Sequence, residues 1–268
     1  AASKVGALDA PNERKVHQMP IPRLGGIAIY LGFVVAVFAS MHLSREIVGL
    51  LLGGTTILMI GIIDDLKTLT PKVKLLGQIL AAGVLVFFGI QIEWITNPFG
   101  DMFYLQYLSV PVTILWIVAL TNTVNLIDGL DGLAAGVSTI AAITICLVAL
   151  DKNFVVAILA ASLAGGALGF LQHNFNPAKI FMGDTGSMFL GYMLAAISVV
   201  GAVKSATTIA LIVPIVALGL PIMDTAFAIV RRFTSGKSIF KADKGHFHHR
   251  LLAIGFTQKQ AVVVMYLI

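Results

Sequence analysis

Eight apolar runs, each about as long as a helix that crosses a lipid bilayer, recur along this chain. A transmembrane helix needs about 20 predominantly apolar residues, and its backbone polar groups must be satisfied within the protein. Charged residues make up only 12% of the chain, against about 25% in soluble domains. The sequence therefore predicts an all-α, polytopic membrane bundle of eight or nine spans. The runs cover 24–43, 47–63, 75–92, 108–127, 133–150, 154–171, 187–203 and 207–230, and a ninth begins near residue 261.

The basic residues divide unevenly between the two ends of this predicted bundle. If the loops alternate between the two sides, one side receives 15 of the 18 Lys and Arg residues, and the other receives Arg45, Lys152 and Lys204. Loops rich in Lys and Arg stay in the cytoplasm. The net charge of +5 thus reports basic cytoplasmic loops, and nucleic acid is not an expected partner. The cytoplasmic loops are 1–23, 64–74, 128–132, 172–186 and 231–260.

Two adjacent carboxylates, Asp64 and Asp65, stand at the end of the second predicted span in GIIDDLKTLTPKVK. A single Asp there is readily explained as a helix end that reaches water. A pair of charges beside hydrocarbon is costly and marks a functional site by default. Lys67, Lys72 and Lys74 follow, where they could meet phosphates or anionic headgroups. We therefore expect a catalytic role for Asp64, Asp65 and Lys74.

The segment TNTVNLIDGLDGL carries Asn122, Asn125 and Asp128 at intervals of three, and Asp131 continues the series. On a helix, residues three apart share one face. Polar groups without partners in an apolar span cost free energy, so the stripe favours a binding site, although a polar seam between helices is the simpler alternative. Gly129, next to Asp128, allows the backbone to approach a ligand.

A third polar segment, HNFNPAKIFMGDTGS, carries Asn174, Asn176 and Asp184. Oxygen ligands from Asp and Asn suit a hard cation such as Mg²⁺ and not zinc. GDTGS on its own could also be an ordinary turn.

The longest cytoplasmic loop contains HFHHR, with His246, His248, His249 and Arg250, amid Lys237, Lys241 and Lys244. A zinc site is one candidate, but the ligand spacing is poor and no cysteine is near. Histidine and arginine donors fit phosphate or diphosphate better. A basic surface over anionic lipid would explain the lysines but not the histidines. Asp224 lies inside a predicted span, and the sequence leaves two roles open for it: support of this site, or a hydrogen bond to a neighbouring helix.

Electrostatics link these segments. Five aspartates gathered at one face would repel one another and any anionic substrate. A divalent cation and a basic loop would relieve both repulsions, and this combination serves phosphoryl transfer, in which catalysis is mostly positioning and charge neutralisation.

The motifs DAPNERKVHQMPIPRLGG, DDLKTLTPKVK, NTVNLIDGLDGL, FNPAKIFMGDTGS and HFHHRL, in this order, resemble those of the polyprenyl-phosphate N-acetylhexosamine 1-phosphate transferases of glycosyltransferase family 4. The first and last motifs resemble the branch that uses UDP-N-acetylglucosamine. The resemblance implies attack by undecaprenyl phosphate on the sugar-bearing phosphorus, with release of UMP. This reaction is the first membrane step of a cell-envelope polysaccharide of the teichoic acid or O-antigen type.

The resemblance also implies roles for individual residues. Asp184 and Asn125 resemble Mg²⁺ ligands, with Mn²⁺ as an alternative metal, and Asp64 and Asp65 resemble the pair that handles the lipid phosphate, one of them a candidate base. Substrate-binding roles near the uridine, diphosphate or sugar fall to a further set. That set is Asn122, Asp128, Asp131, Asn174, His246, His248, His249 and Arg250, with Lys74 also near the diphosphate or sugar.

Members of this family usually have ten or eleven spans, so residues 1–268 are expected to be one membrane-embedded transferase domain, truncated at both ends. The expected location is the bacterial plasma membrane, as a multi-pass protein in contact with membrane lipid, with the active site on the cytoplasmic face. A homodimer is compatible with the resemblance. Direct attack and a covalent aspartyl intermediate both stay open.

Three other functions compete with this reading. The peptidoglycan branch, which transfers phospho-N-acetylmuramoyl-pentapeptide, typically has Thr-Met-Gly-Gly in place of Arg23-Leu24-Gly25-Gly26. The segment from Asp128 to Gly132 echoes the start of the signature of CDP-alcohol phosphotransferases. That signature needs an Arg where Gly136 stands and a further aspartate pair downstream, and this sequence has neither. A cation-coupled transporter would place its polar residues near the bilayer midplane within repeated halves, whereas here they gather at one face.

Overall fold

The computed structural model describes residues 8–9, 21–96, 102–205, 215–234 and 246–268, most of which lie in helices. Two small antiparallel pairs of strands accompany them: β1 (Leu8–Asp9) with β2 (Ile21–Pro22), and β3 (Trp94–Thr96) with β4 (Met102–Tyr104). The prediction of an almost entirely helical protein is confirmed. The helices are α2 (Gly25–Ser40), α3 (Arg45–Lys67), α4 (Pro71–Phe87), α5 (Ser109–Ile127), α6 (Leu133–Ala149), α7 (Phe154–Asn174), α8 (Gly183–Ser205), α10 (Gly219–Thr234), α11 (Phe247–Ala253) and α12 (Gln258–Leu267).

Four helices in the described part of the chain are long and apolar enough to cross a membrane. They are α3, α5 with the 3₁₀ turn that precedes it, α7 and α8. α2 and α6 are apolar but shorter, at 16 and 17 residues. Residues 207–214 of the predicted span 207–230 lie outside the described residues, as do Lys237, Lys241 and Lys244.

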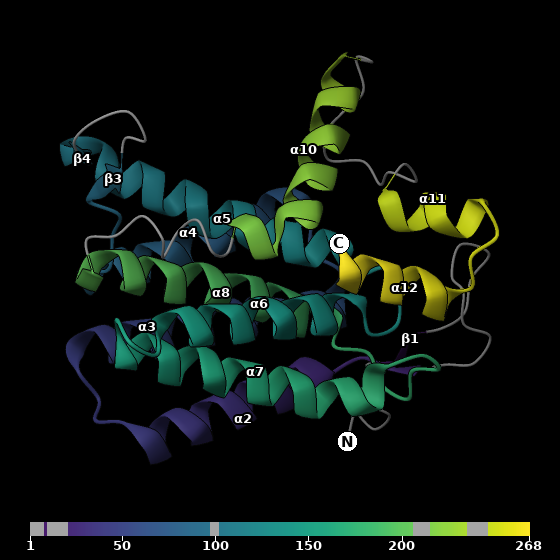
Figure 1. Cartoon of the computed structure of the whole chain (residues 1–268), viewed down its shortest axis with the longest axis horizontal. Coiled ribbons are helices and arrows are strands. Elements are labelled where there is room, and N and C mark those ends of the chain that lie inside the picture. Colours follow the sequence, from purple (N-terminus) through teal and green to yellow (C-terminus); the bar gives the residue numbers. More distant parts are fainter. Residues whose placement is uncertain (1–7, 10–20, 97–101, 206–214, 235–245) are drawn as a thin grey trace.

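Helix α8 is the centre of the bundle and packs against α2, α3, α5, α6 and α7. In its most apolar stretch 94% of the residues are buried, against 39–44% in the other three candidate spans. The helices around α8 run side by side with it (Figure 1). Because α8 begins at the GDTGS segment, the first turn of this central helix is the point where several neighbours can converge.

Local signals in the sequence account for the helix ends. The side chain of Ser44 accepts a hydrogen bond from Ile47 N at the start of α3, and that of Asn153 accepts one from Val156 N at the start of α7. Such caps satisfy backbone donors that have no partner in the first turn. α3 ends where Thr68 adopts a left-handed conformation with φ 47°. α4 then begins at Pro71, whose fixed φ suits a first helical turn.

The end of the bundle that carries α11 and α12 lies opposite the end that carries β3 and β4 (Figure 1). α12 begins with a capping box between Thr257 and Gln260 and packs on α6. The Tyr266 hydroxyl donates to Gly132 O at 2.5 Å. α10 points away from the bundle (Figure 1). The α11–α12 segment is thereby held over the turn between α5 and α6.

Three predicted boundaries are corrected by the structure. α3 continues to Lys67, so Asp64 and Asp65 lie in its last turn and not beyond it. GDTGS forms the first turn of α8, not the loop before it. The expected helical stripe stops at Ile127, because Asp128 has a non-helical ψ of 54° and Gly132 has φ 82°. Asp128 and Asp131 therefore lie in a turn and do not extend the face that Asn122 and Asn125 share.

Candidate active site

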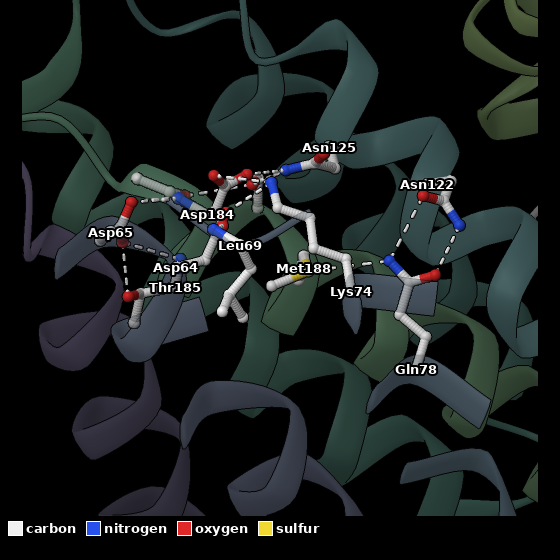
Figure 2. A network of polar contacts seen from close by, with 12 residues as sticks. Asp64, Asp65, Leu69, Lys74, Gln78, Asn122, Asn125, Asp184, Thr185 and Met188 are labelled. Carbon is white, nitrogen blue, oxygen red and sulfur yellow. Dashed lines mark hydrogen bonds and ion pairs between the residues drawn. The ribbon is translucent and has the colours of Figure 1, made fainter. Parts of the chain in front are cut away.

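Four side chains from four helices converge at the first turn of α8 (Figure 2). Asp64 comes from the last turn of α3, Lys74 from the first turn of α4, Asn125 from the last turn of α5 and Asp184 from the first turn of α8. The sequence separates Asp64 from Asp184 by 120 residues. Packing of three helix ends around α8 brings these polar groups together.

Lys74 is shared by two carboxylates. Its Nζ lies 3.0 Å from Asp184 Oδ2 and also contacts Asp64 Oδ2. The side chain of Asp64 is only 2% exposed, and its other oxygen accepts from Leu69 N at 2.5 Å. The side chain of Asp184 is 29% exposed. Of these two carboxylates, Asp184 is the one open to a ligand.

Asn125 completes the surroundings of Asp184. Its Nδ2 donates to Asp184 Oδ1 and, at 2.9 Å, to Ser187 Oγ one turn along α8. The Ser187 hydroxyl in turn donates to Gly183 O at 3.1 Å. Asp184 is thus held from both sides, by an ammonium and by an amide.

Asp65 has a different surrounding from its neighbour Asp64. Its Oδ1 accepts from Asp184 N at 2.9 Å, and its Oδ2 accepts from Thr185 N at 3.0 Å and from the Thr185 hydroxyl at 2.6 Å. A Cβ on Gly183, which has φ 67°, would lie 2.3 Å from Asp65 Oδ2. Asp65 therefore caps the N-terminus of α8, an arrangement that also suits its negative charge.

The turn between α5 and α6 is tied to the loop between α7 and α8. Asp131 Oδ2 accepts from Asn176 Nδ2 and from Ala178 N, both at 3.0 Å. Asn174 is 3% exposed; its Oδ1 accepts from Gly132 N and its Nδ2 donates to Ile180 O, both at 3.0 Å. Asp131 and Asn174, predicted as substrate-binding residues, thus hold the α5–α6 turn against the α7–α8 loop, and their role toward substrate stays a prediction.

Asp128 lies in the same turn and is partly buried. Burial, together with the negative charges of Asp184, Asp65 and Asp131, raises its pKa to about 8, and Arg23 acts in the opposite direction. Desolvation and like charges both disfavour the carboxylate form. The sequence analysis predicted that aspartates would gather here and that a cation would relieve their mutual repulsion. The raised pKa of Asp128 reflects this crowding of negative charge.

The HFHHR segment reaches the same turn through His248. A Cβ on Gly129 would lie 2.8 Å from His248 Nε2, which places the ring directly against the turn. His248 is 2% exposed, and its Nδ1 has no hydrogen-bond partner in the described part of the chain. Burial, with His249 and His246 nearby, lowers its pKa to about 4. His249 and Arg250 are exposed on α11.

Asp224, which the sequence left open, orients this segment. Its Oδ2 lies 2.9 Å from His246 Nδ1, and its Oδ1 accepts from Phe247 N at 3.0 Å. Asp224 therefore caps α11 and holds the ring of His246, which stacks at 5.8 Å on that of His248.

Sequence reasoning missed two residues near the site. Gln78 forms a reciprocal amide pair with Asn122, and Thr185 bonds to Asp65. The position of Gln78, one turn after Lys74 on the same helix, was the available signal, since residues four apart share a face. For Thr185, its place in the GDTGS segment was the signal.

The donors around Asp184 can be tested for their fit to a metal. In the described ranges, no three His, Cys, Asp or Glu side chains lie close enough together to hold an ion by themselves. Mg²⁺ is commonly bound by one or two carboxylates, with water and substrate phosphates completing its six ligands. The partly exposed carboxylate of Asp184 and the nearby negative charges fit that pattern, and Asn125 fits it once its amide turns so that the oxygen, in place of Nδ2, faces Asp184.

Comparison with known proteins places these residues in a family. The model of glycosyl transferase family 4 matches residues 47–202. A probable undecaprenyl-phosphate N-acetylglucosaminyl 1-phosphate transferase of Bacillus subtilis is 46% identical over 271 residues, which cover 100% of this chain and 75% of that protein. A decaprenyl-phosphate N-acetylglucosaminephosphotransferase of Mycobacterium tuberculosis H37Rv is 40% identical, and the match covers 99% of this chain and 74% of that protein. A phospho-N-acetylmuramoyl-pentapeptide-transferase of Halalkalibacterium halodurans is 35% identical, and the match covers 94% of this chain and 82% of that protein.

Proposed function

This chain belongs to glycosyl transferase family 4, and on that premise we propose that it transfers N-acetylglucosamine 1-phosphate from UDP-N-acetylglucosamine to undecaprenyl phosphate, with release of UMP. The observation that carries the proposal is the convergence of Asp64, Lys74, Asn125 and Asp184 at the start of α8. It supplies what phosphoryl transfer needs, namely fixed positions and groups that neutralise charge.

The donor sugar is proposed from the relatives. Two proteins named for N-acetylglucosamine transfer are 46% and 40% identical to this chain, whereas one named for phospho-N-acetylmuramoyl-pentapeptide transfer is 35% identical. The segment Arg23-Leu24-Gly25-Gly26 also differs from the Thr-Met-Gly-Gly that is typical of the pentapeptide branch. Both observations favour UDP-N-acetylglucosamine and a cell-envelope polysaccharide other than peptidoglycan.

In the proposed reaction, an oxygen of the lipid phosphate forms a bond to the sugar-bearing phosphorus of the UDP-sugar. The bond from that phosphorus to the bridging oxygen breaks, and its electron pair leaves with UMP. Lys74 lies where it can neutralise negative charge on the diphosphate. Mg²⁺, or Mn²⁺ in its place, held by Asp184 and Asn125, would supply charge neutralisation at the diphosphate.

Asp64 is our candidate for accepting the proton of the lipid phosphate. It contacts Lys74 and lies beside the exposed carboxylate of Asp184. Asp65 is less suited, because its two oxygens accept three hydrogen bonds from the first turn of α8, whereas the side chain of Asp64 accepts one backbone hydrogen bond and faces Lys74. The burial of Asp64 and its bond to Leu69 N argue against Asp64 itself as the nucleophile of a covalent aspartyl intermediate, and we propose direct attack by the lipid phosphate.

We further propose that eight or nine helices of this chain cross the bacterial plasma membrane and that the site faces the cytoplasm. The uneven division of the basic residues, 15 of 18 in the loops on the side of the site, supports this orientation. An opening toward the cytoplasm gives access to a nucleotide sugar, which cannot enter the hydrocarbon.

We expect release of UMP only when UDP-N-acetylglucosamine, undecaprenyl phosphate and Mg²⁺ are all present with the purified protein. UDP-N-acetylmuramoyl-pentapeptide should react about 10²-fold more slowly, since polar groups placed for one donor are left unpaired by another. A coupled assay for UMP measures both rates. A pentapeptide donor that reacts as fast would reassign the chain to the peptidoglycan branch. Cation flux in proteoliposomes without nucleotide sugar would favour the transporter.

A further inference from the structure

A second set of polar contacts lies one helical turn from the first, on the same three helices (Figure 2). We call Lys74, Asn125 and Asp184 the site layer. Gln78 follows Lys74 by four residues on α4, Asn122 precedes Asn125 by three on α5, and Met188 follows Asp184 by four on α8. Residues three or four apart lie on one helix face. Gln78, Asn122 and Met188 therefore form a support layer directly beside the site layer.

The support layer is a closed set of hydrogen bonds. Asn122 Nδ2 donates to Gln78 Oε1 at 2.6 Å and to Val118 O at 2.8 Å, while Gln78 Nε2 donates to Asn122 Oδ1 at 3.3 Å. Gln78 Nε2 also contacts the sulfur of Met188 at 3.7 Å. Gln78 is 1% exposed. Removal of Asn122 would leave the amide of Gln78 buried without this partner, which is costly.

The pair constrains the helices in a way that their apolar contacts do not. Between membrane helices, apolar side chains are held by van der Waals packing without a hydrophobic driving force, and such contacts are less directional than hydrogen bonds. Two reciprocal amide hydrogen bonds are directional, and they fix both the rotation of α4 about its axis and its position along α5. The site layer depends on that register, because Lys74 from α4 and Asn125 from α5 must reach the same carboxylate of Asp184.

We propose that the Gln78–Asn122 pair is a positioning element that sets the register of α4 and α5, and thereby holds Lys74 and Asn125 on Asp184. The inference rests on the proposed transfer reaction and deepens it. It differs from the predicted role of Asn122 in substrate binding, which stays a prediction, because both polar atoms of that amide are engaged within the protein. Gln78 and Asn122 act through the site layer and do not touch the substrate.

The test compares Gln78→Leu, Asn122→Leu and the double variant with the wild type. Each single variant should lower kcat about 10- to 100-fold, because a small displacement of positioned groups is costly in rate. KM for UDP-N-acetylglucosamine should stay within about threefold, the signature of a loss confined to the transition state. The double variant should lose no more than the worse single variant, because both remove one coupled pair. The exchange Gln78→Asn with Asn122→Gln should recover part of the rate, since it restores two facing amides.

Ser198→Ala is the matched control. The Ser198 hydroxyl accepts from Trp116 Nε1 at 3.0 Å, which is also a side-chain hydrogen bond between two helices of the bundle, α5 and α8. Ser198 lies 14 residues beyond Asp184 along α8, so its loss should lower thermal stability without changing kcat. An equal loss of kcat in Ser198→Ala and Gln78→Leu would overturn the proposal, as would full activity of Gln78→Leu.

A readout without turnover separates this proposal from the proposed function. The Mg²⁺ concentration that gives half of the metal-induced rise in Tm should increase severalfold in Gln78→Leu and stay unchanged in Ser198→Ala, because bound ligand raises stability by mass action. If the wild type transfers no sugar, the proposed function fails and the inference is judged on this shift alone. Identical shifts in the two variants would contradict it.

Discussion

Replacement of Asp184 by alanine should lower the rate of lipid-linked sugar formation by about 10³-fold or more, while the helical bundle stays folded. Asp184 is the partly exposed carboxylate on which Lys74 and Asn125 converge, and it is our principal candidate for binding Mg²⁺. Its removal takes away the group that organises the site layer. The rate is measured as transfer of labelled sugar into lipid at saturating Mg²⁺.

The fold should tolerate this change for a structural reason. The start of α8 is capped by the side chain of Asp65, which bonds to backbone and hydroxyl groups there and not to the Asp184 side chain. Asp151→Ala is the matched control, because Asp151 is exposed in the turn between α6 and α7, and full activity is expected. If Asp184→Ala retained full activity, its metal-binding role would be wrong.

The neighbours Asp64 and Asp65 should respond differently to the same substitution. Asp64→Asn removes the charge that faces Lys74 and the candidate proton acceptor, so we expect a loss of about 10²- to 10⁴-fold in kcat. Asp65→Asn should retain activity within about tenfold, because its one amide oxygen still accepts from the first turn of α8, while its NH2 replaces the second of the two acceptor oxygens that Asp65 uses there. Asp65→Ala removes the cap and should cost about 1 kcal/mol of stability, measured as a lower Tm.

The comparison of the two asparagine variants at several pH values separates proton transfer from capping. If Asp64 accepts a proton, Asp64→Asn should flatten the acid side of the pH–rate profile, whereas Asp65→Asn should preserve its shape. Equal losses in the two variants would show that the charge of Asp65 also takes part in the chemistry. That result would return the roles to the symmetrical pair that the sequence suggested.

The helical architecture could be predicted from the apolar runs. The gathering of the polar motifs at one end of the bundle could be predicted from the way the loops alternate. The different roles of Asp64 and Asp65 could not, because they depend on α3 continuing to Lys67. Consecutive residues on a helix point about 100° apart, so one carboxylate faces Lys74 and the other faces the start of α8. The apolar run stopped at residue 63 and gave no sign of that last turn.

The spacing of three in Asn122, Asn125 and Asp128 predicted one shared helix face, and this prediction is correct only for the two residues within α5. Asn122 and Asn125 share a face, but Asp128 leaves the helix, where the backbone turns toward Gly132. The partner of Asn122, Gln78, comes from a different helix 44 residues earlier. Periodicity describes one helix at a time, and a contact between helices depends on packing that the sequence pattern does not contain.

On our proposal, Asp64, Lys74, Asn125 and Asp184 form a metal-dependent site for transfer of a sugar phosphate to a lipid phosphate. The most direct test is incubation of the protein with radiolabelled UDP-N-acetylglucosamine, undecaprenyl phosphate and Mg²⁺, with label counted in the butanol phase and UMP measured beside it. We predict lipid-linked label and UMP in equal amounts, both lost with EDTA and restored by added Mg²⁺. A folded protein that leaves the butanol phase unlabelled, or that labels it equally well in EDTA, would contradict the account.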